Sequence, residues 1–362
     1  MKIPCSETGI SRQRNHLHIN QLNHIRLLST MGTEEAENQN QDYAILALYQ
    51  FVHPLLSEHE LRSSKEGIER LLLECDARGT ILLAPEGVNG TICFPSKHLK
   101  RVVEDLSSRF PPLRTRLSHH SEHVFLRLKV RVKSEIVSLK DASTQVNSQT
   151  IGEYVKPGPE WDTLIHDPDC LVVDVRNEYE YSCGTFENAE NPHTESFHEF
   201  PSKVPEMIAQ RAQKPKKIAM FCTGGIRCEK ATAWTKQSLE ELGEDIKVYH
   251  LEGGILAYLD KVPEEKSTFK GECYVFDQRT AVTHGLKKSS NLQSCHACRH
   301  VLTAEDRSSN HYQPGVACPY CVTEQTLRQR LRHSERQRHM EENDDPMHLQ
   351  QQNCRKEAPR SS

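Results

Sequence analysis

The chain has 362 residues, a length that predicts two domains plus extensions and suffices for a buried core. Its 46 Lys and Arg residues against 50 Asp and Glu residues give a net charge of −4, so any basic, nucleic-acid-binding surface must be local. No run of about 18 apolar residues occurs, which argues against a membrane span. The 13 cysteines favour metal-bound and reactive thiols in a reducing compartment over disulfides.

Residues 1–41 form a leader that precedes the first domain. The first 31 residues carry four Lys or Arg residues and one acid, Glu7. This composition is typical of an organelle transit peptide, although a disordered leader, or an extension upstream of a chain that starts at Met31, has the same composition. We therefore expect a cytoplasmic protein, or a mitochondrial one if the leader is a transit peptide.

Residues 42–140 are predicted to form a small α+β domain. Asn89-Gly90 predicts a hairpin turn, and Ser96 is expected to cap the second helix. The order β-α-β-β-α-β suggests a ferredoxin-like, acylphosphatase-like sheet. The strands are expected at residues 43–52, 80–84, 91–94 and 124–132, and the helices at residues 55–77 and 97–109.

The last of these strands carries a row of cations. Arg127, Lys129, Arg131 and Lys133 alternate with apolar residues, which places the four charges on one face about 7 Å apart. Such a row could track the phosphate backbone of RNA. The alternative is an ordinary solvated outer face of the sheet.

Residues 150–265 alternate strands and helices, which predicts a doubly wound parallel sheet. Strands are expected at residues 170–175, 217–221 and 246–251, with a helix at residues 229–242. Ligand sites of such sheets form beyond the carboxyl ends of the strands. Cys222 occupies such an end.

The segment after this strand predicts a reactive thiol. A Cys between a strand and a helix faces free backbone N–H groups, which stabilise a thiolate. Gly224 and Gly225 let the chain curl around the sulfur, and Arg227 adds a fixed positive charge. We therefore expect Cys222 to be ionised at neutral pH, or to carry an anionic persulfide. A buried structural Cys beside a tight turn is the alternative.

Three segments resemble a rhodanese domain: residues 174–180 (Asp-Val-Arg-Asn-Glu-Tyr-Glu), residues 184–186 (Gly-Thr-Phe) and the loop 222–227. The Arg lies five positions after the Cys, one fewer than in cysteine-dependent phosphatases. The resemblance implies that Cys222 is the nucleophile, that Arg227 closes the loop, and that Asp174 and Arg176 organise the domain. The other candidate residues around the sulfur are Thr223, Gly224, Gly225, Ile226 and Cys228.

Cys228 has two interpretations. It could resolve an oxidised or persulfidated Cys222 as a disulfide. Alternatively, it is simply a small residue at the start of the helix, since neighbouring thiols at a strand–helix turn can point apart.

Longer segments resemble a narrower family, the rhodanese-like tRNA uridine hydroxylases. They are residues 84–90 (Ala-Pro-Glu-Gly-Val-Asn-Gly), 221–231, 250–255 and 271–277, and the similarity runs from Tyr43 to Cys321. It implies an oxygen-dependent 5-hydroxylation of the wobble uridine, with tRNA as partner and molecular oxygen as co-substrate. His198 stands where many relatives carry Arg, which affects the substrate contacts expected near the loop.

Residues 270–325 contain two Cys-x-x-Cys pairs, Cys295/Cys298 and Cys318/Cys321. Two such pairs complete a tetrahedral four-thiolate site, which predicts a structural zinc knuckle. Redox-active dithiols are the alternative. A site closed by four sulfurs has no open position for substrate, so the metal is expected to stabilise the fold.

Residues 326–362 are predicted to be a basic helix followed by a disordered tail from residue 341 onward. Five arginines face one acid, Glu335, between residues 326 and 340. The helix could contact phosphates, or it could be solvated. The five arginines are Arg328, Arg330, Arg332, Arg336 and Arg338.

The main functional hypothesis is therefore a tRNA-modifying enzyme that hydroxylates a wobble uridine. The second is a sulfurtransferase that moves persulfide sulfur from a small-molecule donor to a thiol acceptor, which needs only the central domain. The third is a non-enzymatic RNA-binding or scaffold protein.

Overall fold

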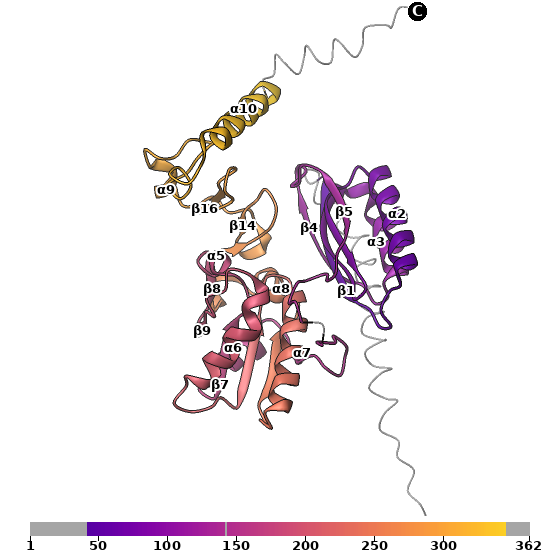
Figure 1. The fold of residues 1–362 in the computed structure, drawn as a ribbon, viewed down its shortest axis with the longest axis vertical. Coiled ribbons are helices and arrows are strands. Elements are labelled where there is room, and N and C mark those ends of the chain that lie inside the picture. Colours follow the sequence, from indigo (N-terminus) through magenta and orange to yellow (C-terminus); the bar gives the residue numbers. More distant parts are fainter. Residues whose placement is uncertain (1–41, 142, 345–362) are drawn as a thin grey trace, which may run out of the picture. The chain divides into compact units, whose positions relative to one another are not determined.

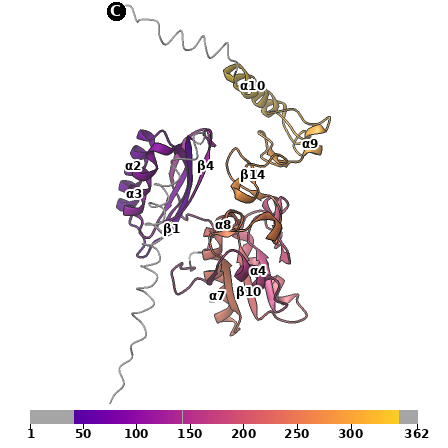
Figure 2. The same cartoon turned by 180° about the vertical axis from the view of Figure 1, so that it is seen from behind.

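The structure is a computed structural model that describes residues 42–141 and 143–344 (Figures 1 and 2). The described chain forms two compact units. One contains residues 42–153, 197–202 and 226–248, and the other contains residues 154–196, 203–225 and 249–344. The predictions for the leader and for the tail after residue 344 lie outside the described residues.

The first domain is a five-stranded sheet with two helices. Its elements are β1 (Tyr43–Phe51), α2 (Glu58–Glu74), β2 (Arg78–Ala84), β3 (Gly87–Pro95), η1 (Ser96–His98), α3 (Leu99–Arg109), β4 (Arg114–His120) and β5 (Leu128–Val132). The strand order is β4-β1-β3-β2-β5. The first four strands pair antiparallel and β5 pairs parallel with β2. This order confirms the ferredoxin-like fold and adds a fifth strand.

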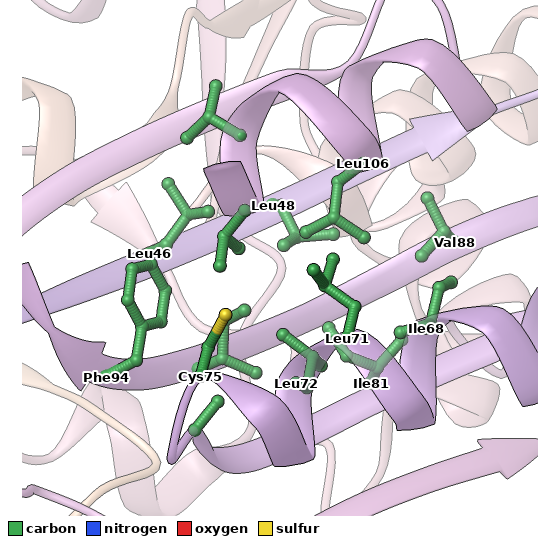
Figure 3. Close-up of a cluster of buried hydrophobic side chains, with 14 of the residues drawn as sticks. Leu46, Leu48, Ile68, Leu71, Leu72, Cys75, Ile81, Val88, Phe94 and Leu106 are labelled. Carbon is green, nitrogen blue, oxygen red and sulfur yellow. The ribbon is translucent and has the colours of Figure 1, made fainter. Parts of the chain in front are cut away.

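Both helices cover the same face of this sheet (Figures 1 and 2). Apolar residues three and four apart put one stripe of each helix inward. Figure 3 shows Leu71 and Leu72 of α2 and Leu106 of α3 against the strands, where Leu46 of β1 is fully buried. The Ser57 hydroxyl caps α2 by accepting from the Glu60 N–H at 3.3 Å. The Ser and Glu three residues apart thus fix where this helix begins.

Two local predictions for this domain are wrong: the turn at Asn89-Gly90 and the cap of the second helix by Ser96. Asn89-Gly90 lies in the middle of β3, and the connection between β2 and β3 is Pro85-Glu86, because Ala84 pairs with Gly87. The Asn89 side chain instead donates to the Ile136 carbonyl at 2.9 Å. α3 follows a 3-10 turn and its first turn has no side-chain cap.

The edge strand β4 was missed, and the predicted last strand begins at Leu128, four residues later than expected. β4 escaped detection because all seven of its residues are half-buried and mostly polar, so it lacks the apolar alternation of an ordinary strand.

The central domain is built on a second five-stranded sheet. Its elements are β6 (Glu153–Val155), α4 (Pro159–Ile165), β7 (Cys170–Asp174), α5 (Glu178–Tyr181), β8 (Gly184–Phe186), β9 (Ala189–Glu190), η2 (Phe197–Glu199), α6 (Phe200–Ala209), β10 (Lys217–Phe221), α7 (Ile226–Glu241), β11 (Lys247–Leu251) and α8 (Gly254–Lys261). The strand order is β6-β11-β10-β7-β9, and β7 pairs parallel with both β10 and β9.

The strands β7 and β10 are buried on both faces. Successive residues of β10 from Ile218 to Phe221 are all fully buried, as expected for a sheet with helices on both sides. On one face, Trp161 of α4 and Tyr258 of α8 pack with Phe186 and Phe221 in edge-to-face contacts. The predicted doubly wound architecture is therefore confirmed.

The C-terminal part consists of short elements. They are η3 (Glu264–Lys266), β12 (Phe269–Gly271), β13 (Cys273–Tyr274), β14 (Ala281–Val282), η4 (His284–Leu286), β15 (Gln293–Ser294), β16 (Val301–Leu302), α9 (Ala304–Ser308) and α10 (Leu327–Asp344). β12 pairs with β8, β13 with β14 and β15 with β16. α10 extends to Asp344, so helix continues for four residues beyond the predicted start of the tail. Among the described residues, no helix is long and apolar enough to cross a membrane.

Candidate active site

Cys222 lies directly after β10, at the carboxyl end of the sheet. The N–H of Val175, the residue after β7, donates to the carbonyl of Phe221, the last residue of β10, at 3.0 Å. This bond holds the ends of the two strands together. Cys222 is fully buried, and its Sγ accepts from the Gly225 N–H at 3.1 Å. Gly225 has φ +98°, a conformation that favours glycine. The structure thus places a backbone amide at the sulfur, as the sequence predicts.

The start of α8 holds the same loop from the other side. The Ile255 and Leu256 N–H groups donate to the carbonyls of Cys222 and Thr223 at 2.9 and 3.0 Å. Gly254 lies so close that a Cβ there would be 2.4 Å from the Cys222 oxygen. Residues 250–255 belong to the segments that resemble the family, but nothing local in the sequence shows which loop Gly254 approaches.

Thr223 and Glu180 form a second anchor of the loop. The Thr223 hydroxyl donates to Glu180 Oε1 at 3.0 Å, and Glu180 is fully buried. The other oxygen, Oε2, accepts from the Asn177 N–H at 3.3 Å and so caps α5. Glu180 thus anchors the loop, a contact that the sequence pattern did not predict. Its position three residues after a capping Asn was the available signal.

Asp174 and Arg176 form a buried ion pair. Both are fully buried, and Arg176 Nη2 lies 2.6 Å from Asp174 Oδ2. Arg176 Nη2 also donates to the Gly184 carbonyl, and the Thr185 hydroxyl donates to Asp174 at 2.9 Å. Burial opposes the charge, but Asp174 raises the pKa of Arg176. These contacts tie β7 to β8, which fits an organising role for the pair.

The remaining candidates lie on or beside α7, which begins at Ile226. Arg227 is 9% exposed and Cys228 is fully buried in its first turn. Gly224 lies on the open side of the loop, because a Cβ added there would have no neighbour within 4 Å. The roles of Arg227 as loop cation and of Cys228 as resolving thiol stay predictions.

Two other cysteines, the buried Cys170 and the half-buried Cys183, are chemically different from a reactive thiol. Burial raises the pKa of Cys170 in β7 to about 12 and that of Cys183 to about 11. Since the thiolate is the nucleophile, both should be inert at neutral pH. Cys170 is therefore a suitable internal reference for Cys222.

The two Cys-x-x-Cys pairs converge in the C-terminal module. The sulfur atoms of Cys295, Cys298, Cys318 and Cys321 all lie within 4.8 Å of one another. The Cys298–Cys318 and Cys318–Cys321 sulfur distances are 3.6 and 3.7 Å. A metal ion could be held there. His300 instead stacks on Tyr320 with 3.7 Å between ring centroids, outside this set of four ligands.

Comparison with known proteins identifies the family. Residues 43–136 match the UPF0176 acylphosphatase like domain and residues 159–261 match the rhodanese-like domain. The tRNA uridine(34) hydroxylase of Teredinibacter turnerae is 45% identical over 302 residues, covering 83% of this chain and 90% of the relative. That of Acaryochloris marina is 45% identical over 307 residues, covering 83% and 93%. The chain belongs to the tRNA uridine(34) hydroxylase family.

A solved structure of Saccharomyces cerevisiae Ygr203w, described as a homolog of single-domain rhodanese, is 16% identical. It covers 35% of this chain and 92% of its own, with a TM-score of 0.27. The assignment to the tRNA uridine(34) hydroxylase family rests on the two hydroxylases and does not depend on this structure.

Two basic surfaces of this family member are exposed. Arg127 and Lys133 flank β5, Arg131 is exposed within it, and Lys129 is half-buried. In α10, Arg336 points back and donates to the His296 and Gly315 carbonyls at 2.9 Å each. The other arginines of the helix are exposed, namely Arg328, Arg330, Arg332 and Arg338. His198, the position that departs from the resemblance, is half-buried in η2.

Proposed function

We propose that this protein hydroxylates uridine 34 of tRNA at C5, with Cys222 as the reacting sulfur and molecular oxygen as co-substrate. The observation that carries the proposal is the Cys222 sulfur at the carboxyl end of β10, with the Gly225 N–H at 3.1 Å, in a chain 45% identical to tRNA uridine(34) hydroxylases. An amide donor at that distance stabilises a thiolate or another anionic sulfur species.

The surrounding residues supply orientation and charge. The α8 amides hold the carbonyls of Cys222 and Thr223, and the bond to Glu180 holds the Thr223 side chain, so the loop that carries the sulfur is anchored from two sides. Arg227, in the first turn of α7, would supply positive charge to the anionic sulfur. The loop borders open space beside Gly224, where a Cβ would meet nothing within 4 Å, and we expect the base to approach from this side.

The four-cysteine cluster holds a structural zinc ion in this proposal. Zn–S bonds of about 2.3 Å in a tetrahedron place the sulfurs about 3.8 Å apart, close to the 3.6 and 3.7 Å observed. The hydrogen bond between Cys298 and Cys295 lowers the pKa of Cys295 and raises that of Cys298, and a bound metal ion would favour the thiolate form of its ligands. Cys295, Cys298, Cys318 and Cys321 then complete a closed site.

The tRNA would be bound through its phosphates by the cations of β5 and α10. Both surfaces are exposed, and neither is part of the loop that holds Cys222. Phosphate contacts position a nucleic acid without reading its sequence. The Cys222 loop would therefore select the uridine, and the basic surfaces would supply most of the binding to the tRNA backbone.

The test is a gene disruption complemented with variants, followed by mass spectrometry of nucleosides from bulk tRNA. We expect 5-hydroxyuridine to fall in the disruptant and to return with the wild-type chain. Cys222→Ala should fail to restore it. Cys170→Ala, a matched buried cysteine, should restore it fully. Growth without oxygen should abolish it in the complemented strain.

Unchanged 5-hydroxyuridine in the disruptant would contradict the proposal. So would full restoration by Cys222→Ala, which would leave the scaffold interpretation. Rapid thiocyanate formation from thiosulfate and cyanide, lost in Cys222→Ala and without any change in hydroxyuridine, would favour the sulfurtransferase alternative.

A further inference from the structure

The start of α7 carries two charged side chains that the proposed reaction does not use. Glu229 is 5% exposed and Lys230 is 1% exposed. They belong to the same compact unit as the first domain. Charged groups at this depth are rare and need several partners, so their contacts show what this turn is fixed to.

Lys230 is held by four acceptors. Its Nζ lies 3.0 and 2.8 Å from the two oxygens of Glu86, 2.6 Å from Glu135 Oε2 and 3.0 Å from the Val137 carbonyl. Glu86 is half of the two-residue connection between β2 and β3. Burial opposes ionisation of Glu135, but the hydrogen bond from Lys230 prevails and lowers its pKa.

The two carboxylates are themselves anchored by backbone amides. Glu86 Oε1 accepts from the Ile136 N–H at 2.7 Å, and Glu135 Oε2 accepts from the Leu139 N–H at 2.9 Å. The ammonium therefore sits in a cage built from the β2–β3 connection and the segment after β5. A lysine so fixed has little freedom to move.

Neighbouring residues of the turn are fixed in the same way. Glu229 Oε1 accepts from the Tyr49 hydroxyl at 2.8 Å and lies 3.2 Å from Arg114 Nε. Ile226, the first residue of α7, packs against the apolar cluster of Phe51, Ala84 and Ile136. The apolar contact of Ile226, the carboxylate of Glu229 and the ammonium of Lys230 thus hold the start of α7 against the first domain.

This turn follows the Cys222 loop without an intervening residue. Gly225, whose N–H donates to the Cys222 sulfur, is bonded directly to Ile226. A displaced first turn of α7 would act on Gly225 through this bond, and so on the direction of its N–H. Hydrogen bonds weaken steeply with misalignment, so the stabilisation of the thiolate depends on where α7 begins.

We propose that Lys230 is a positioning residue of the Cys222 loop, held by Glu86 and Glu135, and that the first domain thereby sets the reactivity of the thiol. The proposal deepens the proposed function and rests on it for its biological meaning. Two of the segments that resemble the family, residues 84–90 and 221–231, are joined by this ion pair. A buried ion pair is weak evidence for stability alone, because apolar replacements are often as stable.

The test measures the reactivity of Cys222 and needs no tRNA. Purified variants react with iodoacetamide between pH 5 and 10, and the rate at the Cys222 peptide is followed by mass spectrometry. Circular dichroism checks that each variant is folded. Lys230→Met should slow alkylation at pH 7 about tenfold and move the profile about one pH unit upward. Glu86→Gln, which leaves Glu135 and Val137 as acceptors, should give a smaller shift.

Arg279→Met is the matched control. Arg279 and Asp277 form another buried ion pair, with side chains 8% and 3% exposed and Nη2 2.6 Å from Oδ2. The control should lose stability and leave the Cys222 profile unchanged. A folded Lys230→Met protein with the wild-type profile would overturn the proposal, as would an equal shift in Arg279→Met. If Lys230→Met does not fold, an unshifted Glu86→Gln profile overturns it.

This result is separable from the proposed function. If Cys222→Ala restores 5-hydroxyuridine while Lys230→Met shifts the alkylation profile, the proposed function fails and the positioning role stands. If 5-hydroxyuridine needs Cys222 and the Lys230→Met profile is unshifted, the positioning role alone fails.

Discussion

Substituting Gly254 by Ala tests whether α8 holds the Cys222 loop. An added Cβ would lie 2.4 Å from the Cys222 oxygen, 2.7 Å from the Thr223 oxygen and 2.9 Å from the Gly224 nitrogen. All three are backbone atoms, which cannot swing aside as a flexible side chain would. The loop or the helix must therefore move.

Gly243, just after α7, is the matched control. Its φ is +69°, against +67° for Gly254, but a Cβ there would meet nothing within 4 Å. Gly243→Ala should therefore be destabilised only by the strain of a left-handed backbone, about 1–2 kcal/mol. In Gly254→Ala the same backbone strain is joined by overpacking, which should lower the free energy of unfolding by about 1–3 kcal/mol more. The difference between the two variants isolates the contact with the loop.

Urea unfolding gives the two free energies, and the alkylation rate of Cys222 reports the state of the loop. We expect Gly254→Ala to be less stable than Gly243→Ala and to alter that rate, because Gly225 shares the loop. Equal stabilities of the two variants, or a wild-type alkylation rate in Gly254→Ala, would refute the view that α8 fixes the sulfur.

Two further predictions concern the other sites. Removing the metal with a chelator should increase proteolysis of the C-terminal module and leave alkylation of Cys222 unchanged, and purified protein without bound zinc would contradict this. Replacing Arg127 and Arg131 by Gln should weaken tRNA binding and lower its salt dependence by roughly 2 in the log–log slope. The pair Arg62 and Arg70, exposed on α2, is the control, and equal effects in both pairs would contradict a specific role for β5.

The features that could be predicted from sequence are local ones. The strand–Cys–Gly-Gly–Arg–helix order placed Cys222 and the Gly225 amide, because the geometry of a strand–helix turn follows from a few consecutive residues. The two Cys-x-x-Cys pairs were likewise found from spacing alone. Both features are defined by neighbours in the chain, and the structure brings them together as expected.

The features that escaped are contacts between distant segments. Lys230 lies 144 positions from Glu86, and Gly254 approaches a loop some thirty residues earlier only because α8 follows the neighbouring strand. Asn89-Gly90 failed as a turn for the same reason, since Asn89 bonds to Ile136 across the fold. Hydrophobic pattern and helix or strand propensity describe neighbouring residues only. They therefore do not predict which distant residues meet when the chain folds.

Glu180 has two duties on one carboxylate: one oxygen caps α5 and the other receives the Thr223 hydroxyl. Gln would keep only one acceptor, and Asp would be too short for at least one of the two bonds. Even the two most similar residues would thus break one of the two hydrogen bonds. We therefore expect Glu180 to be retained as this enzyme evolves. The start of α5 and the Cys222 loop, which both bond to it, should change together or not at all.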